Sequence, residues 1–437
     1  MMTPHDILGT DGSIARRLER YELRQEQLDM SNAVWEAFRK EHHLAVEAGT
    51  GVGKSFAYLI PAILQTAGED IHCSGDDTPP RAVISTHTIS LQEQLIDKDI
   101  PFLRSVLPFE FTAVLVKGRS NYLCFRRLKS AGEKMANLFE DRKKREMQRI
   151  TAWSKTDSDG SKSSLNPEPD WEIWNEICCE TGNCLGKKCP HNNDCFYGIA
   201  RRRIANAQIL VVNHAVLFSD LALKAGGGSI LPLYRYLVLD EAHTVEQAAA
   251  EHLGISVTQY QAEYNLNRLY NSRTQKGLLQ GTKIDSENRT AAQQAVDECF
   301  YAAETFFLSL QDYLDERPGS NGRIKETHIV ANPLSGSMRK LQETLRHIIE
   351  KTEDMNERTE LKSARDKIAA LAAEVDVWMQ QSLEAESVYY LDRQFTSRGR
   401  PRVSLNAVPI DIGPILREQL FNKIPSVILT SATLTNG

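Results

Sequence analysis

The sequence predicts an α/β fold in which one parallel-sheet domain is interrupted by two inserted segments. Three observations support this fold class: a strand, glycine-rich loop and helix at residues 43–66; further apolar strands at 82–86, 209–214, 236–243 and 426–437; and two stretches that break this alternation, one rich in cysteine and one helical. Strands that alternate with helices are typical of a parallel sheet.

The elements follow from the local patterns in chain order. We expect a helical stretch from Ile14 to Phe38, a strand from His43 to Glu47 and an apolar helix from Phe56 to Thr66. After a polar loop, Glu69 to Pro80, the pattern predicts a strand from Ala82 to Thr86 and a helix starting near Ser90. The α/β alternation stops near residue 116 and returns with the strands at 209–214 and 236–243.

The interrupting stretches have their own patterns. Residues 126–149 are charged and helical in character, and residues 154–170 predict a low-complexity linker. Between residues 255 and 387 apolar side chains recur at helical spacing, which predicts core-facing stripes. These stripes comprise Leu341, Leu345, Ile348, Leu361, Ile368, Leu371, Val375, Trp378 and Met379.

Length and composition limit the class of protein. The 437 residues suggest two to four domains at roughly 100–200 residues each, and 41% hydrophobic residues are ordinary for a soluble globular chain. No apolar run approaches the roughly 18 residues of a membrane span, and the start lacks an apolar signal core, so we expect a cytoplasmic protein. The net charge of −6 excludes a protein that is basic throughout but allows a local basic groove.

A phosphate-binding loop is the clearest motif. It comprises Ala48, Gly49, Thr50, Gly51, Val52, Gly53, Lys54 and Ser55, between a predicted strand and a predicted helix. Glycines let backbone amides turn toward phosphates, and the following helix presents its N-terminus to the anion. We expect Lys54 to reach the β- and γ-phosphates of ATP and the Ser55 hydroxyl to bind Mg²⁺.

A second acidic motif ends an apolar strand at Asp240-Glu241-Ala242-His243. We expect Asp240 to hold Mg²⁺ and Glu241 to orient or deprotonate the attacking water. Lys54, Asp240 and Glu241 are therefore the predicted catalytic residues.

Together these motifs resemble those of superfamily-two helicases. The phosphate-binding loop, the DEAH sequence and Ser431-Ala432-Thr433 resemble motifs I, II and III, respectively. The resemblance of motifs II and III implies that His243, Ser431, Ala432 and Thr433 couple ATP hydrolysis to movement. Arg24 and Gln27 resemble the adenine-reading Q-motif, and the segment containing Thr86 and Gln92 resembles motif Ia, which contacts DNA.

The wide separations between motifs resemble the XPD-like branch of this superfamily. Lys54 and Asp240 are 186 residues apart, and Asp240 and Ser431 are 191 apart. Residues 116–124 are similar to the bacterial DinG members. The resemblance implies a RecA-like motor domain at 1–115, 206–254 and 388–437, an iron–sulfur insertion at 116–205 and a helical Arch-like insertion at 255–387. It also implies a second motor domain, for which we expect no room after Thr433.

Cysteines cluster in the first insertion. Five of the eight fall within 18 residues, and in a cytosolic protein such clustering favours a metal site or cluster over disulfides. The family resemblance implies that Cys124, Cys184, Cys189 and Cys195 bind a [4Fe–4S] cluster, which needs four thiolates. Two alternatives remain open: unliganded thiols, or a zinc site with Cys184, Cys189 and Cys195 plus His191 or Cys179.

Basic and aromatic residues flank the cysteines. Aromatic faces stack bases while Arg and Lys follow phosphates, which suits a single strand. The predicted DNA-binding residues here are Lys117, Arg119, Tyr122, Arg201, Arg202 and Arg203, with Arg126, Arg127, Phe196 and Tyr197 beside them.

The resulting prediction is an ATP-dependent DNA helicase that acts 5′→3′ by resemblance and uses ATP, Mg²⁺ and a [4Fe–4S] cluster. Its partners would be single-stranded DNA and forked or strand-displaced duplexes, in repair or replication. We expect this chain by itself to unwind poorly. The alternative is an ATP- and single-strand-binding module without helicase activity. A small-molecule kinase or switch would not explain the DEAH and Ser-Ala-Thr motifs together.

Overall fold

The computed structural model describes residues 2–68, 80–135, 141–225, 227–281, 283–383, 386–395, 399 and 401–433. Most of the predicted loop from Glu69 to Pro80 therefore lies outside the described residues. The chain forms two compact units: unit 1 comprises 1–118, 198–253 and 412–437, and unit 2 comprises 119–197 and 254–411. Within the described ranges no helix combines the length and apolar character needed to cross a membrane.

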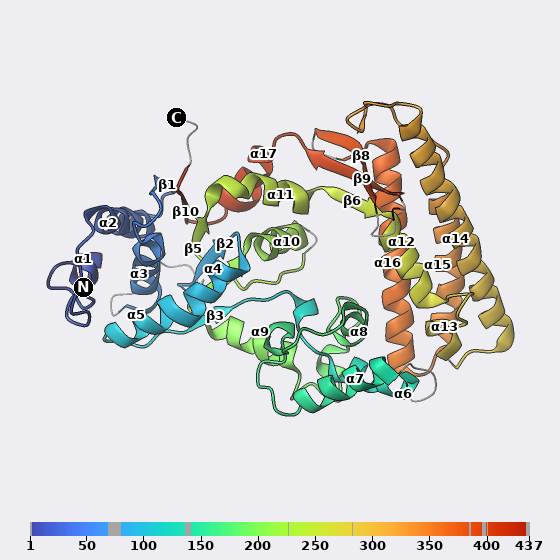
Figure 1. Ribbon diagram of the computed structural model, residues 1–437, viewed down its shortest axis with the longest axis horizontal. Helices are drawn as coiled ribbons and strands as arrows, with labels where there is room; N and C mark the ends of the chain where they lie inside the picture. The colour runs from blue at the N-terminus through green and yellow to red at the C-terminus, as the bar shows by residue number, and fades with distance from the viewer. Residues whose placement is uncertain are drawn as a thin grey trace. The chain divides into compact units, whose positions relative to one another are not determined.

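Unit 1 is built on a parallel six-stranded sheet with the order β1-β10-β5-β2-β4-β3 (Figure 1). Its strands are β1 (Leu44–Glu47), β2 (Ala82–Thr86), β3 (Ala113–Leu115), β4 (Ile209–Asn213), β5 (Tyr236–Asp240) and β10 (Ser426–Ser431). This arrangement confirms the predicted α/β fold class. The inner strands read as continuous apolar runs because helices cover both faces of the sheet.

Two hydrophobic cores sandwich this sheet. Alternate side chains along a strand point to opposite faces; Ile84 and Val238 belong to one core, and Val83 and Leu239 to the other. The helices around them are α1 (Pro4–Leu8), α2 (Gln25–Lys40), α3 (Lys54–Ala67), α4 (Ile89–Gln94), the π-helical turn η1 (Leu95–Asp99), α5 (Ile100–Val106), α9 (Phe196–Asn206), α10 (His214–Ala225), α11 (Val245–Leu253), α17 (Gly413–Leu416) and the π-helical turn η6 (Arg417–Phe421).

The predicted helix from Ile14 is wrong in its first half, because α2 begins only at Gln25. Ile14 is buried, but its backbone N–H donates to the carbonyl oxygen of Ile7 at 3.1 Å instead of starting a helix. The buried side chain of Ile14 therefore extended the apolar pattern of the helix in the sequence, although Ile14 itself is not helical.

The cysteine-rich part of unit 2 contains α6 (Phe125–Met135), α7 (Asp141–Trp153) and α8 (Trp171–Ile177), with short 3₁₀ turns at Arg119–Asn121, Lys162–Ser164, and Gly186–Lys188. Residues 154–170 are not a loose linker as predicted. Ser161 is fully buried and forms a β-bridge with Tyr122. Gly160 has φ +65°, and a Cβ there would lie 1.9 Å from the Phe196 ring, so only glycine fits.

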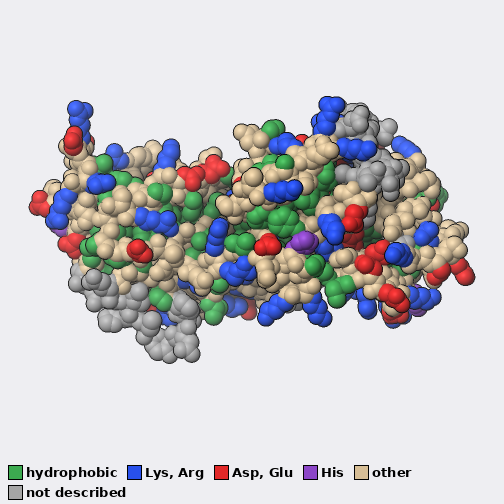
Figure 2. All heavy atoms as spheres, turned by 90° about the horizontal axis from the view of Figure 1, so that it is seen from below, with side chains coloured by type: hydrophobic (Ala, Val, Ile, Leu, Met, Phe, Trp, Pro, Cys, Tyr) green, Lys and Arg blue, Asp and Glu red, His purple; other side chains and the backbone are tan. Residues whose placement is uncertain are grey.

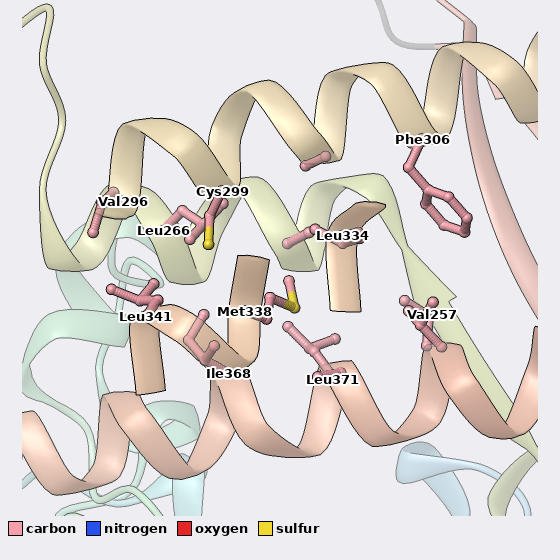
Figure 3. Close-up of a cluster of buried hydrophobic side chains, with 14 of the residues drawn as sticks. Val257, Leu266, Val296, Cys299, Phe306, Leu334, Met338, Leu341, Ile368 and Leu371 are labelled. Atoms are coloured by element: carbon pink, nitrogen blue, oxygen red, sulfur yellow. The ribbon is translucent and has the colours of Figure 1, made fainter. Parts of the chain in front are cut away.

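The remainder of unit 2 packs long helices around one core (Figure 3). The helices are α12 (Gln259–Leu269), α13 (Leu278–Gly281), α14 (Ser286–Asp315), α15 (Pro333–Lys351) and α16 (Met355–Gln380). Every residue of the predicted apolar stripes is buried in this core, including Leu341, Ile368 and Leu371, which point into it in Figure 3.

An antiparallel sheet completes this helical part. Its order is β6-β9-β8-β7, with β6 (Ile255–Thr258), β7 (Arg323–Ile324), β8 (Ser387–Phe395) and β9 (Pro401–Pro409). The backbone pairing of β8 and β9 with β6 and β7 keeps residues up to 411 in unit 2, whereas the predicted motor segment began at 388. A long-range β pairing of this kind has no local sequence signal.

Candidate functional site

Three predicted motifs meet at the carboxyl ends of adjacent strands in unit 1. Strand β10 lies between β1 and β5, with Ser431 opposite Glu47 and Thr430 opposite Asp240. The backbone N–H of Ala48 donates to the carbonyl oxygen of Ser431 at 3.0 Å. In open parallel sheets ligands bind beyond these strand ends, so the sheet order brings together residues that lie nearly 400 positions apart in the chain.

The glycine-rich loop connects β1 to α3. Gly51 and Gly53 have φ of 89° and 87°, a left-handed backbone that glycine adopts without strain. Helix α3 starts at Lys54, two residues earlier than predicted, so the N–H groups of its first turn, including those of Lys54 and Ser55, face away from the helix and are free of intrahelical bonds. Gly49, Thr50 and Val52 lie in this loop, which can hold an anion.

Lys54 joins the loop to the acidic motif. Its Nζ lies 3.4 Å from the carbonyl oxygen of Ala48 and 3.7 Å from Oε1 of Glu241. The predicted catalytic cation and carboxylate are thus neighbours.

Asp240 is a buried carboxylate with both oxygens bonded. Its side chain is held by the Tyr58 hydroxyl, which donates to Oδ2 at 2.9 Å, and by the Glu241 N–H, which donates to Oδ1 at 3.0 Å. Burial raises the pKa of Asp240, and these two hydrogen bonds oppose that effect. Glu241 itself has φ 53°, a left-handed conformation that is uncommon outside glycine and concentrates at functional sites.

His243 links the acidic motif to the end of β10. Its Nδ1 lies 2.8 Å from Oγ of Ser431 and 3.5 Å from Oε2 of Glu241. The Ser431 hydroxyl also accepts from the backbone N–H of Thr433 at 3.2 Å, across Ala432. Three of the four predicted coupling positions, His243, Ser431 and Thr433, therefore form one hydrogen-bonded group, with Ala432 between the last two.

The two predicted adenine-reading residues contact the loop backbone. The Gln27 side chain is buried and donates to the carbonyl oxygen of Gly53 at 2.8 Å, and Arg24 donates to that of Gly51. A Cβ on Gly53 would lie 2.1 Å from Nε2 of Gln27, so the two segments are in close contact. Adenine recognition by Arg24 and Gln27 stays a prediction.

One residue near the site, Tyr58, was missed at the sequence level. Tyr58 lies one helical turn after Lys54, a spacing that places both on one face of α3 and was the available signal. His214 follows β4, and its Nδ1 lies 2.7 Å from Oγ of Ser85 at the end of β2. Burial, together with the nearby His87 and His243, lowers the pKa of His214 to about 4, so it is neutral at pH 7.

The four predicted cluster cysteines all lie in unit 2. Cys184 is exposed, and Cys124, Cys189 and Cys195 are partly exposed. A hydrogen bond from the Cys179 thiol and another from the Gly186 N–H lower the pKa of Cys184 to about 5, whereas burial raises that of Cys124. Among the described residues, no three His, Cys, Asp or Glu side chains converge as a metal site. As a donor set, four thiols in one part of unit 2, with the cationic Arg119 and Arg126 near Cys184, suit an anionic thiolate-bound group.

Several predicted DNA contacts are buried. Thr86, Gln92 and Tyr122 are at most 5% exposed, so their side chains are not on the surface. Arg126 and Arg127 are buried too: Arg127 donates to backbone carbonyls of Cys178 and Asn175, and Arg126 to that of Asn183. Their guanidinium groups stabilise the cysteine-bearing loops, because buried carbonyl oxygens need hydrogen-bond donors.

The remaining predicted DNA contacts divide between the two units. In unit 2 the Arg119 guanidinium lies 4.4 Å from the Tyr197 ring centroid. In unit 1 Lys117 is partly exposed, and Arg201 donates to the carbonyl oxygen of Ile230. Arg202 and Arg203 are exposed and line a groove of about 390 Å³ beside the edge strand β3, together with Arg104. On the face drawn in Figure 2, Lys and Arg side chains are interspersed with Asp and Glu.

Comparison with known proteins identifies similar sequences. The family model "DEAD/DEAH box helicase" matches residues 29–135. The ATP-dependent DNA helicase YoaA of Escherichia coli (strain K12) is 27% identical over 98% of this chain and 63% of its own length. The ATP-dependent helicase DinG of Mycobacterium tuberculosis (strain H37Ra) is 35% identical over 58% of this chain and 40% of its own length.

Two further similarities cover nearly the whole chain. The 3′-5′ exonuclease DinG of Bacillus subtilis (strain 168) is 25% identical over 98% of this chain and 47% of its own length. A solved structure named "Truncated XPD" aligns with 93% of this chain and 93% of its own, at a TM-score of 0.41 and 12% identity. The chain thus spans between about two fifths and two thirds of the length of these curated relatives.

Proposed function

We propose that this chain is part of a DNA helicase similar to the DEAD/DEAH box proteins of the DinG type, and that unit 1 binds and hydrolyses ATP with Mg²⁺ as its motor part. The observation that carries the proposal is the meeting of Lys54, Glu241 and the His243–Ser431 pair at adjacent strand ends. The proposed substrate is single-stranded DNA, including forked or strand-displaced duplexes, with 5′→3′ movement in repair or replication.

Each residue of this site has a chemical role in the proposal. The loop amides and Lys54 bind the phosphates and neutralise charge that develops on them. Glu241 is 3.7 Å from Lys54 and accepts a proton from, or orients, the attacking water. His243 couples changes at the hydrolysis site to Ser431 through their hydrogen bond.

The residues also fit Mg²⁺, which in nucleotide sites takes few protein oxygens and completes its shell with phosphates and water. Asp240 and Ser55 supply a carboxylate and a hydroxyl, and both contact the Tyr58 hydroxyl. When bound, the metal would neutralise charge on the phosphate oxygens.

We expect single-stranded DNA to bind the chain, and the Arg202–Arg203 groove to contribute to this binding. Charge reversal of both residues, Arg202→Glu with Arg203→Glu, should weaken binding of an oligonucleotide about tenfold or more at low salt and flatten its salt dependence, because fewer counterions are released. Fluorescence anisotropy across a salt series measures both effects.

The matched control is Arg16→Glu with Arg17→Glu, an adjacent exposed pair of unit 1 that does not line the groove. Unchanged affinity in the Arg202/Arg203 variant would rule out this groove. Absence of oligonucleotide binding by the wild-type chain would count against the helicase proposal itself.

The cysteine insertion is proposed to hold a [4Fe–4S] cluster through Cys124, Cys184, Cys189 and Cys195. Four thiols within one folded part of the chain, with arginines beside them, support this proposal. Protein prepared without oxygen should contain about four iron atoms and four sulfides per chain with visible charge-transfer absorbance. Cys184→Ser should lower the iron content severalfold.

Cys299→Ser is the control, since Cys299 is buried in the helical core of unit 2 and outside this donor set. Zinc without iron in such protein would overturn the iron–sulfur proposal in favour of the zinc alternative. Iron content that is equal in both serine variants would remove Cys184 from the ligand set.

A further inference from the structure

The position of Tyr58 follows from the helix that carries Lys54. Helix α3 starts at Lys54, and residues four apart on a helix lie one above the other on the same face. Lys54 is in the first turn, facing the loop, and Tyr58 is one turn deeper, with a side chain that is fully buried. The Tyr58 hydroxyl therefore lies directly beneath the phosphate loop, inside the sheet–helix interface.

This hydroxyl contacts both residues that are proposed to hold Mg²⁺. It donates to Oδ2 of Asp240 at 2.9 Å, and the Ser55 side chain lies close to the same phenol oxygen and to Asp99. The other carboxylate oxygen of Asp240 accepts from the Glu241 N–H at 3.0 Å. The Asp240 carboxylate is thus held at both oxygens, which fixes its rotation.

These two hydrogen bonds are the main interactions that fix the Asp240 carboxylate. Its side chain is 2% exposed, so water gives it little solvation. A buried carboxylate without partners rotates toward whatever donor it can reach or takes up a proton. Removal of the phenol hydroxyl would leave Oδ2 with neither a protein donor among these contacts nor bulk water.

We propose that Tyr58 is a positioning residue for the metal end of the nucleotide site: its hydroxyl holds the Asp240 carboxylate in the orientation that binds Mg²⁺. This inference rests on the proposed function, because it requires that the site binds a nucleotide with a divalent metal. Partners that orient a metal ligand typically contribute 10–100-fold to metal affinity. The ring of Tyr58 packs in the core, so the hydroxyl and the ring have separable roles.

Tyr58→Phe tests the hydroxyl and keeps the ring. The measurement is equilibrium binding of a fluorescent ADP analogue, first without divalent metal and then across a Mg²⁺ or Mn²⁺ titration. We expect the half-saturating metal concentration to rise about tenfold or more, while the metal-free affinity for ADP stays unchanged. A merely structural role would shift both measurements or neither.

Tyr236→Phe is the matched control. Tyr236 is also buried, begins the strand that ends in Asp240, and uses its hydroxyl to accept from Gln65 at 3.0 Å rather than to contact Asp240. Its loss should lower stability in the way that any buried hydroxyl deletion does, without a change in the metal titration. Thermal unfolding of both variants measures that shared cost.

The outcomes separate this inference from the proposed function. If wild-type protein binds the analogue with metal and Tyr58→Phe matches it, the positioning role is refuted and the proposed function stands. If Tyr236→Phe shifts the metal titration as much as Tyr58→Phe does, the effect is structural and the positioning role is likewise refuted. If wild-type protein binds no nucleotide at any metal concentration, both proposals fail.

Discussion

Replacing Lys54 by alanine is expected to weaken binding of ATP about 10- to 100-fold. The ammonium group lies at the loop, 3.4 Å from the Ala48 carbonyl oxygen and 3.7 Å from Glu241, with only 13% of the side chain exposed. Hydrogen bonds to charged groups contribute about 1.5–3 kcal/mol each, and 1.4 kcal/mol is tenfold in affinity. Titration calorimetry with ATP and Mg²⁺ measures the loss.

The control for this variant is Lys40→Ala, which removes a lysine of the same unit that is 65% exposed and pairs with Glu36 on α2. It should bind ATP as the wild type does. Glu241→Gln is the companion variant: binding should persist while hydrolysis falls, because the carboxylate acts on water rather than on the phosphates. Full ATP affinity in Lys54→Ala would contradict the assignment of this loop as the nucleotide site.

Replacing Glu180 by glutamine is expected to destabilise unit 2 by about 3 kcal/mol or more. Glu180 follows the cysteine pair Cys178–Cys179 and bonds to Arg268 of α12 at 2.6 and 2.8 Å, with Lys367 of α16 and Arg127 of α6 also paired to it. Its loss leaves three partly buried cations close together without the anion, and removal of one partner from a buried ion pair costs about 3–5 kcal/mol. Denaturant unfolding followed by tryptophan fluorescence measures the change.

The pH dependence gives a second readout for Glu180. Burial favours the neutral acid, but the hydrogen bonds and charges of Arg268, Arg127 and Lys367 outweigh it and hold the pKa of Glu180 well below the ordinary value of 4.5. A depressed carboxyl pKa stabilises the fold above its unfolded value, and this stabilisation is lost as the pH falls below that value. The stability difference between wild type and Glu180→Gln should therefore be full at pH 7 and shrink below about pH 4.5.

Glu343→Gln is the control for both readouts, because Glu343 forms an exposed pair with Arg346 on α15, and exposed pairs contribute little. Its unfolding midpoint should match that of the wild type at each pH. A Glu180→Gln protein as stable as the wild type at pH 7 would show that the cations find other partners, and the four-residue network would not be a stabilising one.

By itself the sequence determined the features that depend on neighbouring residues. Continuous apolar runs specified the strands at β2, β4, β5 and β10, since both faces of each are covered. Helical spacing specified the core stripes of α15 and α16. The glycines of the phosphate loop were recognisable because a tight turn around an anion needs left-handed backbone at Gly51 and Gly53.

Only the tertiary structure decided which distant residues act together. Strand order placed Asp240 and Ser431 beside the loop that carries Lys54, although 186 and 191 residues separate the motifs. Arg126, Arg127 and Tyr122 were predicted to lie on a DNA-binding surface, but they are buried and stabilise the interior of unit 2. The sequence does not show whether a charged or aromatic side chain faces water or a buried backbone carbonyl. The contact of Tyr58 with Asp240 likewise depends on how α3 packs against β5, and pairing across that distance leaves no local pattern in the chain.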